Sequence, residues 1–250
     1  MYIDTHCHLL KSDFNNVDEV IIKLDNNYAI VSGAEINDNK EVINLINKYN
    51  NIYGTIGLHP SEATKYKKED LEYIEQNLNN KKIVGIGEIG LDYHYGKEDA
   101  NLQKELFIKQ LDLARKYKLP VTIHSRDALL DTFEIVKMYK DLKITYHCYS
   151  YSLEHAKELL KQNIKFGING VVTFKNSRVI KEVVEYLPLE NLLLETDSPY
   201  LSPEPVRGTK NFPSNVQIVA QKIAEIKKIP YEIVLKTTFD NAKRQFDLNI

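Results

Sequence analysis

The feature that most constrains the fold of this chain is a regular alternation of two kinds of segment. Short apolar runs rich in β-branched residues alternate with longer stretches in which apolar residues recur at helical spacing. Several of the short runs are apolar on both faces, like strands of a parallel sheet covered by helices. Strands are expected at Tyr2–Thr5, Ala29–Gly33, Ile52–Ile56, Ile83–Gly87, Val121–Ile123, Ile144–Tyr146, Lys165–Ile168 and Leu192–Leu194.

The amphipathic stretches between these runs predict helices, and Asn or Asp precedes several of them as a cap. Helices are expected at Val17–Asn26, Lys40–Tyr49, Lys68–Leu78, Glu98–Tyr117, Ala128–Lys140, Leu153–Lys161, Val179–Tyr186 and Ser214–Lys227. The alternation yields about eight β-then-α units, the number that closes a TIM-type (β/α) barrel. An open doubly wound sheet is the competing architecture.

The length of 250 residues suits a single α/β barrel. The chain has neither a linker nor a low-complexity tract, so a single domain is expected over residues 1–250. The long, Pro-rich stretch over residues 198–213 predicts a loop that lines a site rather than a domain boundary.

Charge and composition exclude several classes of protein. A net charge of −2 and a pI near 6.4 exclude a basic protein that coats polyanions, so any nucleic-acid contact must be local. Two cysteines do not make a disulfide framework, which favours a reducing compartment. Neither a signal peptide nor a membrane helix is predicted, so the cytoplasm is the expected location.

The strongest local signal is the segment Asp4-Thr5-His6-Cys7-His8 at the end of the first strand. Side chains at positions i and i+2 of a strand share a face, so His6 and His8 project together. Two imidazoles at the carboxyl end of a strand form a pair of candidate metal ligands. The simpler alternative is a solvated turn that contains two histidines by chance.

Further candidates stand at the same place in later units. Glu88, His124 and His147 end strands four, five and six, and Asp197 follows strand eight. Each alone is more simply explained as a cap or a core polar residue. With His6 and His8 they make four histidines and two carboxylates, which would line the carboxyl-end mouth of a barrel, where they would be costly to bury without cations. The set exceeds the three protein ligands usual for one catalytic zinc, which favours a two-metal site.

These motifs occur in an order that resembles the TatD family of metal-dependent deoxyribonucleases, over essentially the whole chain. The motifs are Asp4-Thr5-His6-Cys7-His8, Gly57-Leu58-His59-Pro60, Gly87-Glu88-Ile89-Gly90-Leu91-Asp92-Tyr93, His124-Ser125-Arg126, His147-Cys148-Tyr149-Ser150, Glu195-Thr196-Asp197-Ser198-Pro199-Tyr200-Leu201, Pro205-Val206-Arg207-Gly208 and Asn211-Phe212-Pro213. One departure is Tyr151, which stands where the family more often has a small residue.

The resemblance implies a barrel of the amidohydrolase superfamily with two divalent cations, Mg²⁺, Mn²⁺ or Zn²⁺. It assigns one cation to His6, His8 and Asp197, and the other to His124 and His147, with Glu88 bridging both. Two cations that share a water lower its pKa, and Asp197 would accept the proton as general base. Catalysis is thus expected from Asp197 and Glu88. Glu195, on the strand face of Asp197, is either a support for the ligands or a core residue.

Four residues are candidate substrate contacts. Arg207, beside Gly208 in the Pro-rich loop, suits bidentate contact with phosphate, the alternative being a surface charge. Asn211 is expected to assist it. His59 would lie at the mouth, near the scissile phosphate. Arg126, next to His124, is equally suited to binding substrate or to orienting a carboxylate.

The leading hypothesis is a monomeric exonuclease that hydrolyses DNA phosphodiester bonds, trimming single strands or 3′ ends. Strand preference and direction come from the family resemblance alone. The alternative within hydrolases is cleavage of another ester or amide, by a misacylated-tRNA deacylase or a small-molecule amidohydrolase. A non-catalytic scaffold that binds nucleic acid or protein is the third possibility, and the intact ligand set argues against it.

Overall fold

Eight strands alternate with helices along the chain in the computed structural model, which describes residues 1–250. The strands are β1 (Ile3–Cys7), β2 (Tyr28–Ser32), β3 (Ile52–Ile56), β4 (Ile83–Asp92), β5 (Val121–Arg126), β6 (Ile144–Tyr146), β7 (Lys165–Ile168) and β8 (Leu192–Leu194). Four of them, β3, β6, β7 and β8, begin and end as predicted. The strands β1, β4 and β5 run further than predicted at their carboxyl ends, where the candidate ligands stand.

Nine α-helices and five short 3₁₀ turns connect and follow the strands. The helices are α1 (Val17–Ile22), α2 (Ile36–Lys48), α3 (Lys68–Asn77), α4 (Ala100–Tyr117), α5 (Leu129–Val136), α6 (Leu153–Leu160), α7 (Arg178–Tyr186), α8 (Val216–Lys227) and α9 (Tyr231–Gln245). The 3₁₀ turns are η1 (Pro60–Glu62), η2 (Lys137–Tyr139), η3 (Gly170–Thr173), η4 (Leu189–Asn191) and η5 (Pro213–Asn215).

The helix α9 is the one that the hydrophobic pattern did not predict. Its buried positions are Val234, Thr238, Asn241, Ala242 and Gln245. Three of these are polar, so the apolar periodicity that indicates a helix is weak here. The buried polar groups bond internally: the Asn241 Nδ2 donates to the carbonyls of Leu189 and Leu192, at 2.8 and 2.9 Å.

The chain divides into two compact units. Unit 1 comprises Met1–Val31 and His147–Ile250, and unit 2 comprises Ser32–Tyr146. A single hydrolase domain over residues 1–250 stays a prediction.

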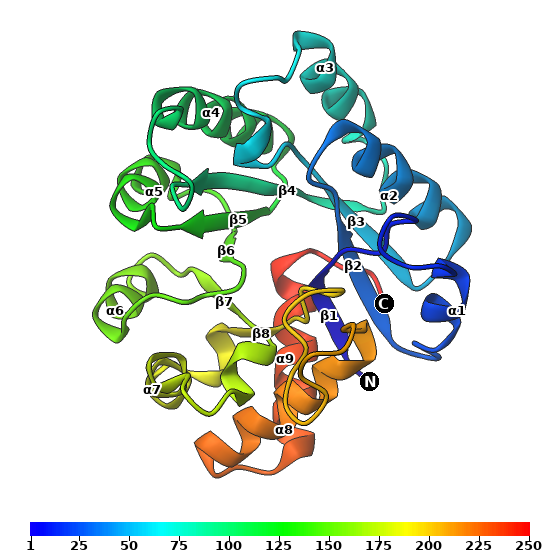
Figure 1. Ribbon diagram of the computed structural model, residues 1–250, viewed down its shortest axis with the longest axis vertical. Coiled ribbons are helices and arrows are strands. Elements are labelled where there is room, and N and C mark those ends of the chain that lie inside the picture. Colours follow the sequence, from blue (N-terminus) through cyan, green and yellow to red (C-terminus); the bar gives the residue numbers. More distant parts are fainter. The chain divides into compact units, whose positions relative to one another are not determined.

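In unit 2 the strands β3, β4, β5 and β6 pair in parallel and in chain order. The helix α2 packs on β3, α4 packs on β4, and α5 contacts β4 and β5 (Figure 1). Leu106, Phe107, Leu111 and Ala114 form the buried side of α4. Gly90 of β4 has a φ of +146°, and a Cβ there would lie 1.9 Å from the His124 carbonyl oxygen. The glycine therefore allows β5 to approach β4 closely where His124 stands.

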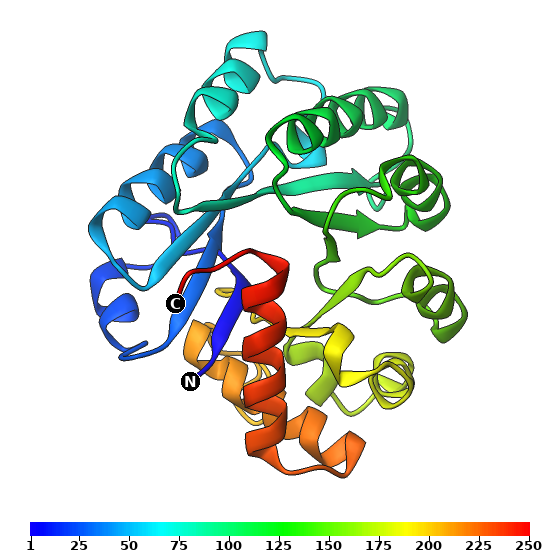
Figure 2. The same cartoon turned by 180° about the vertical axis from the view of Figure 1, so that it is seen from behind.

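In unit 1 the strand β1 pairs in parallel with β2, and β7 with β8. The ends of β1 and β8 are joined by polar contacts, among them the Thr5 hydroxyl, which donates to the Leu194 carbonyl at 2.9 Å. The helix α9 lies along β1 and β8, with α8 against it (Figure 2). The strands β1 and β8 are thus joined to each other and packed against α9.

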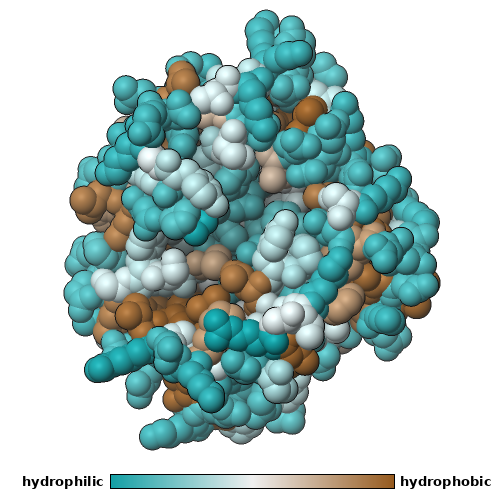
Figure 3. Space-filling model, viewed as in Figure 1, coloured by the Kyte–Doolittle hydropathy of each residue, from teal (hydrophilic) through white to brown (hydrophobic).

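The surface is mostly polar. Teal, hydrophilic residues dominate the face drawn in Figure 3, and hydrophobic residues reach it in separate patches. The composition agrees, since 27% of the residues are charged. None of the helices is both long enough and apolar enough to cross a membrane.

Buried side-chain amides bind the peptide groups at the strand ends of unit 2. Asn39 of α2 accepts from the Gly57 N–H at 3.1 Å and donates to its carbonyl at 2.8 Å. Gln110 of α4 does the same for Leu58, at 2.7 and 2.9 Å. Gly57 and Leu58 lead directly into His59, so helix amides replace strand pairing where the candidate site begins.

We expect Gln110→Leu to lower the free energy of unfolding by about 2–4 kcal/mol, because it leaves two buried peptide groups of Leu58 without partners. Urea denaturation followed by circular dichroism measures the change. Gln76→Leu is the matched control, since Gln76 lies exposed on α3 and should alter stability by less than about 0.5 kcal/mol. Equal effects of the two substitutions would contradict the proposed role of Gln110 as the partner of the Leu58 peptide groups.

Candidate metal centre

Three predicted ligands of unit 1 converge. His6 and His8 leave β1 on one face, and Asp197 follows β8. The Nε2 atoms of His6 and His8 lie 3.6 and 3.5 Å from Asp197 Oδ1. One ligand atom from each residue lies within 4.8 Å of the other two. His6 is fully buried and His8 nearly so, which confirms that these residues do not form a solvated turn.

Backbone hydrogen bonds hold this cluster in place. The Asp197 N–H donates to the His6 carbonyl at 3.0 Å, and the His8 N–H donates to the Ser198 carbonyl at 2.7 Å. Asp197 adopts a φ of +57°, in the left-handed region that Asp tolerates better than most residues. The carboxylate is therefore turned toward the two imidazoles by the chain itself.

Asp4 also holds this cluster in place. Its carboxylate accepts hydrogen bonds from the Thr196 N–H at 3.0 Å, the Thr196 hydroxyl at 2.5 Å and the His6 N–H at 3.3 Å. Complete burial raises the pKa of Asp4 well above its usual value, although the bonds from Thr196 and His6 oppose the rise. Asp4 thus ties the backbone of His6 to that of Thr196, next to Asp197.

The fourth ligand candidate of unit 1, His147, stacks on His6 with 4.0 Å between the ring centroids. Glu195 lies behind it, with 3.7 Å between Glu195 Oε1 and His147 Nδ1, and accepts from the Cys148 N–H at 2.5 Å. Burial raises the pKa of Glu195, while His147 opposes the rise. Of the two roles open for Glu195, the structure favours that of a support for a ligand histidine.

Two predicted ligands of unit 2 also meet. Glu88 of β4 is buried, and its Oε1 lies 2.8 Å from Nδ1 of His124, on β5. The ring of His59 packs edge-on against that of His124, with 4.5 Å between centroids. The Nδ1 of His59 accepts from the Ser61 N–H at 3.2 Å, which fixes its ring at the start of η1. Unit 2 therefore brings Glu88, His124 and His59 together.

Asp92 joins this group and was not predicted from the sequence. Its Oδ2 lies 3.0 Å from His124 Nε2, and His59, Asp92 and His124 each offer a ligand atom within 4.8 Å of the others. Burial raises the pKa of Asp92, but hydrogen bonds from His124 and from the His94 N–H outweigh it and leave the pKa below its usual value. The sequence did contain a signal for Asp92, because Asp92 stands four residues after Glu88 on the same face of β4.

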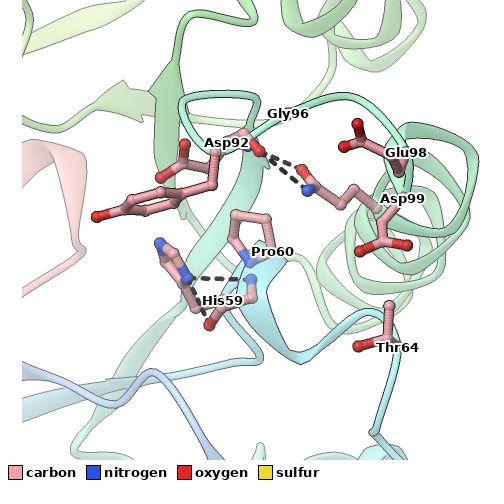
Figure 4. Close-up of a pocket in the computed structure, with 10 residues that line it drawn as sticks. His59, Pro60, Thr64, Asp92, Gly96, Glu98 and Asp99 are labelled. Carbon is pink, nitrogen blue, oxygen red and sulfur yellow. Dashed lines mark hydrogen bonds between the residues drawn. The ribbon is translucent and has the colours of Figure 1, made fainter.

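A cavity of about 190 Å³ opens beside His59 and Asp92 (Figure 4). Glu98 and Asp99, just before α4, line the cavity on the side opposite His59 and Asp92 (Figure 4). The cavity thus carries three carboxylates, so its own lining disfavours an anion.

The predicted substrate contacts differ in exposure. Arg207 is 56% exposed; its guanidinium carbon lies 4.1 Å from the Phe174 ring centroid, and Nη1 lies 3.8 Å from Glu204 Oε1. Arg126 is exposed, with its guanidinium carbon 5.9 Å from the centroid of the Tyr95 ring. Both arginines can reach a ligand in solvent.

Asn211, the other predicted contact of the Pro-rich loop, is fully buried. Its Nδ2 donates to the carbonyls of Thr196 at 3.0 Å and Tyr200 at 2.7 Å, and its Oδ1 accepts from the Phe212 N–H and the Asn215 amide. The amide is thus used to shape the loop after Asp197, and any effect of Asn211 on substrate runs through that shape.

The donor set fits a divalent cation. Two imidazoles and one carboxylate are ligands that Zn²⁺ and Mn²⁺ accept, and three protein ligands leave coordination positions for water or substrate. The cluster of His6, His8 and Asp197 meets this requirement within unit 1. Such a site, on repeated β/α units, defines the class of metal-dependent hydrolases on an α/β barrel scaffold.

Comparison with known proteins gives the family. The family model described as "TatD related DNase" matches residues 3–247. The chain therefore belongs to the TatD family, and it is a metal-dependent hydrolase.

Relatives match along their whole length. The uncharacterized metal-dependent hydrolase YabD of Bacillus subtilis is 39% identical over 100% of both chains. The uncharacterized metal-dependent hydrolase MJ1582 of Methanocaldococcus jannaschii is 40% identical, over 98% of this chain and 96% of its own.

Among solved structures, the TatD homologue YjjV of Escherichia coli is 29% identical to this chain. It matches with a TM-score of 0.89, over 99% of this chain and 98% of its own. This likeness confirms the predicted TIM-type α/β barrel as the fold class and excludes the open doubly wound sheet.

We expect Gly167→Ala to displace Glu195, since a Cβ at Gly167 would lie 2.1 Å from Glu195 Oε2. Overpacking of this kind costs about 1–3 kcal/mol of unfolding free energy, measurable by urea denaturation. Glu195→Asp shortens the side chain, so the double variant should lose less stability than the two single losses added together. Strict additivity in this double-mutant cycle would show that the clash lies elsewhere.

Proposed function

We propose that this protein is a deoxyribonuclease that hydrolyses phosphodiester bonds of DNA with two divalent cations. The observation that carries the proposal is the convergence of His6, His8 and Asp197 in a member of a DNase-related family. The finer expectation, exonucleolytic trimming of single strands or 3′ ends by a monomer, belongs to the same proposal and rests on the family resemblance.

The cations would be held by residues already described. His6, His8 and Asp197 would bind the first. Glu88 and His124 of unit 2, with His147 of unit 1, would bind the second, and Glu88 would bridge; this set rests on the family resemblance. When bound, two divalent cations lower the pKa of a shared water and neutralise charge on the phosphoryl oxygens.

The side chains of the protein supply orientation and a proton acceptor. Asp197 is the proposed general base, because its side chain is 14% exposed and a water can reach the carboxylate. Asp4 and Glu195 hold the backbone of His6 and the ring of His147, so neither ligand needs to reorganise when substrate arrives.

Arg207 is the proposed phosphate contact. The Phe174 ring under the guanidinium limits its freedom while leaving the side chain more than half exposed. A guanidinium can bind two oxygens of one phosphate, which a misacylated-tRNA deacylase or an amidohydrolase does not require at the scissile group.

We expect Asp197→Asn to reduce the rate of DNA hydrolysis by about 10²–10⁴-fold while the fold is retained, because the amide cannot accept the proton. Chelation of the wild-type protein with EDTA should abolish the same activity, and added Mn²⁺ should restore it. The measurement is nucleotide release from an end-labelled single-stranded oligonucleotide. Activity that survives both Asp197→Asn and EDTA would refute the proposed site.

We expect Arg207→Ala to lower kcat/KM on the oligonucleotide by about 10- to 100-fold, from the loss of a charged hydrogen bond. Arg178→Ala is the matched control: Arg178 is 88% exposed on α7 and pairs with Glu182. Hydrolysis of an uncharged ester such as p-nitrophenyl acetate separates the classes of hydrolase. If Arg207→Ala impairs both substrates equally, Arg207 does not recognise phosphate.

A further inference from the structure

The Asp92 carboxylate is fixed before any ligand binds. Asp92 and Gln103 of α4 exchange two hydrogen bonds: the Asp92 N–H donates to Gln103 Oε1 at 2.9 Å, and Gln103 Nε2 donates to the Asp92 carbonyl at 2.9 Å. The Oδ1 atom of Asp92 accepts from the His94 N–H at 2.9 Å. Backbone and carboxylate are thus both held, and Oδ2 is directed at His124.

His124 lies between two carboxylates. Its Nδ1 is 2.8 Å from Glu88 Oε1, and its Nε2 is 3.0 Å from Asp92 Oδ2. A neutral imidazole has one N–H and one lone pair, so only one of its nitrogens can bind a cation while the other donates a hydrogen bond. His124 can therefore bind a cation on the side of one carboxylate while it donates a hydrogen bond to the other.

We propose that Asp92 is a positioning residue: it accepts the Nε2–H of His124 and so presents the Nδ1 lone pair, on the Glu88 side, to a divalent cation. A carboxylate behind a ligand histidine selects the tautomer, fixes the ring and raises the basicity of the ligand nitrogen. The inference deepens the proposed function, since it rests on His124 being a metal ligand.

A cation bound directly by His59, Asp92 and His124 is the competing arrangement. It would take the lone pair of His124 Nε2. In that arrangement Nδ1–H would donate to Glu88, so His124 could not also bind a cation on the Glu88 side without losing its ring proton. Since the proposed function assigns His124 to the cation that Glu88 would bridge, it requires the hydrogen bond between Asp92 and His124, and the experiment separates the two arrangements.

The test is a calorimetric titration of the full-length metal-free protein with Zn²⁺. We expect Asp92→Ala to weaken the binding of one Zn²⁺ by roughly 10- to 100-fold with the stoichiometry unchanged. Asp92→Asn should weaken it less, because its amide oxygen can still accept the Nε2–H. Circular dichroism melting identifies any variant that fails to fold.

A spectroscopic readout reports the tautomer itself. Long-range ¹H–¹⁵N spectra of the Zn²⁺ form should show His124 protonated at Nε2 in the wild type, and Asp92→Ala should lose this pattern. The His124→Gln spectrum assigns the signal. Asp127→Ala is the matched control, because Asp127 pairs with His94 at the same 3.0 Å but with both side chains well exposed. It should change neither zinc affinity nor the His124 signal.

Two outcomes would overturn the inference while leaving the proposed function intact. One is unchanged zinc affinity in Asp92→Ala. The other is loss of one whole equivalent of Zn²⁺ in both Asp92→Ala and His59→Ala, which would make Asp92 a direct ligand. Absence of Zn²⁺ binding by the wild type would instead refute the metal centre itself, and the inference with it.

Discussion

Peptide groups at the carboxyl ends of the parallel strands are the constraint on which the rest of the structure depends. Each such group is buried and must find a hydrogen-bond partner where regular pairing stops. In unit 2 the partners are the helix amides of Asn39, Gln110 and Gln103. In unit 1 the amide of Asn211, in the Pro-rich loop, donates to the carbonyl of Thr196 after β8. A side-chain amide carries both donor N–H groups and an acceptor oxygen, so it can bind the N–H and the carbonyl of one peptide group, as Asn39 and Gln110 do. The loops that carry the candidate ligands are therefore rigid without regular secondary structure.

Carboxylates support the candidate ligand histidines in a similar way. Asp4 holds the backbone beneath His6, Glu195 lies behind His147, and Asp92 faces His124. Each is buried or half-buried, where a hydrogen bond is stronger than in water and a misplaced ring is costly. Supports of this kind keep histidines in one orientation, so the free energy of reorganisation on binding a cation is small.

The sequence predicted the parts of this arrangement that follow from periodicity. Strands β3, β6, β7 and β8 were located to the residue, because each is a short apolar run between polar segments. The carboxyl ends of β4 and β5 were missed, because Glu88, Asp92 and Arg126 break the apolar pattern. The helix α9 was not predicted for the same reason, since polar Asn241 lies on its buried face. The residues that serve as candidate ligands could thus be predicted from the strand ends. The residues that support them could be identified only from the tertiary hydrogen bonds.

In the proposed nuclease, the charges of unit 1 bear on the order in which a cation and a phosphodiester would bind. Asp4 and Glu195 are fully buried, whereas Asp197 is partly exposed beside the imidazoles of His6 and His8, so an anionic phosphodiester would meet a carboxylate there. Arg207 cannot reverse this balance, since Glu204 lies 3.8 Å from its guanidinium. A divalent cation changes the sign of the local field, because it is the largest charge in such a site. In the proposed nuclease, cation binding would therefore come before the phosphate, and the metal would be a condition for recognition as well as for chemistry.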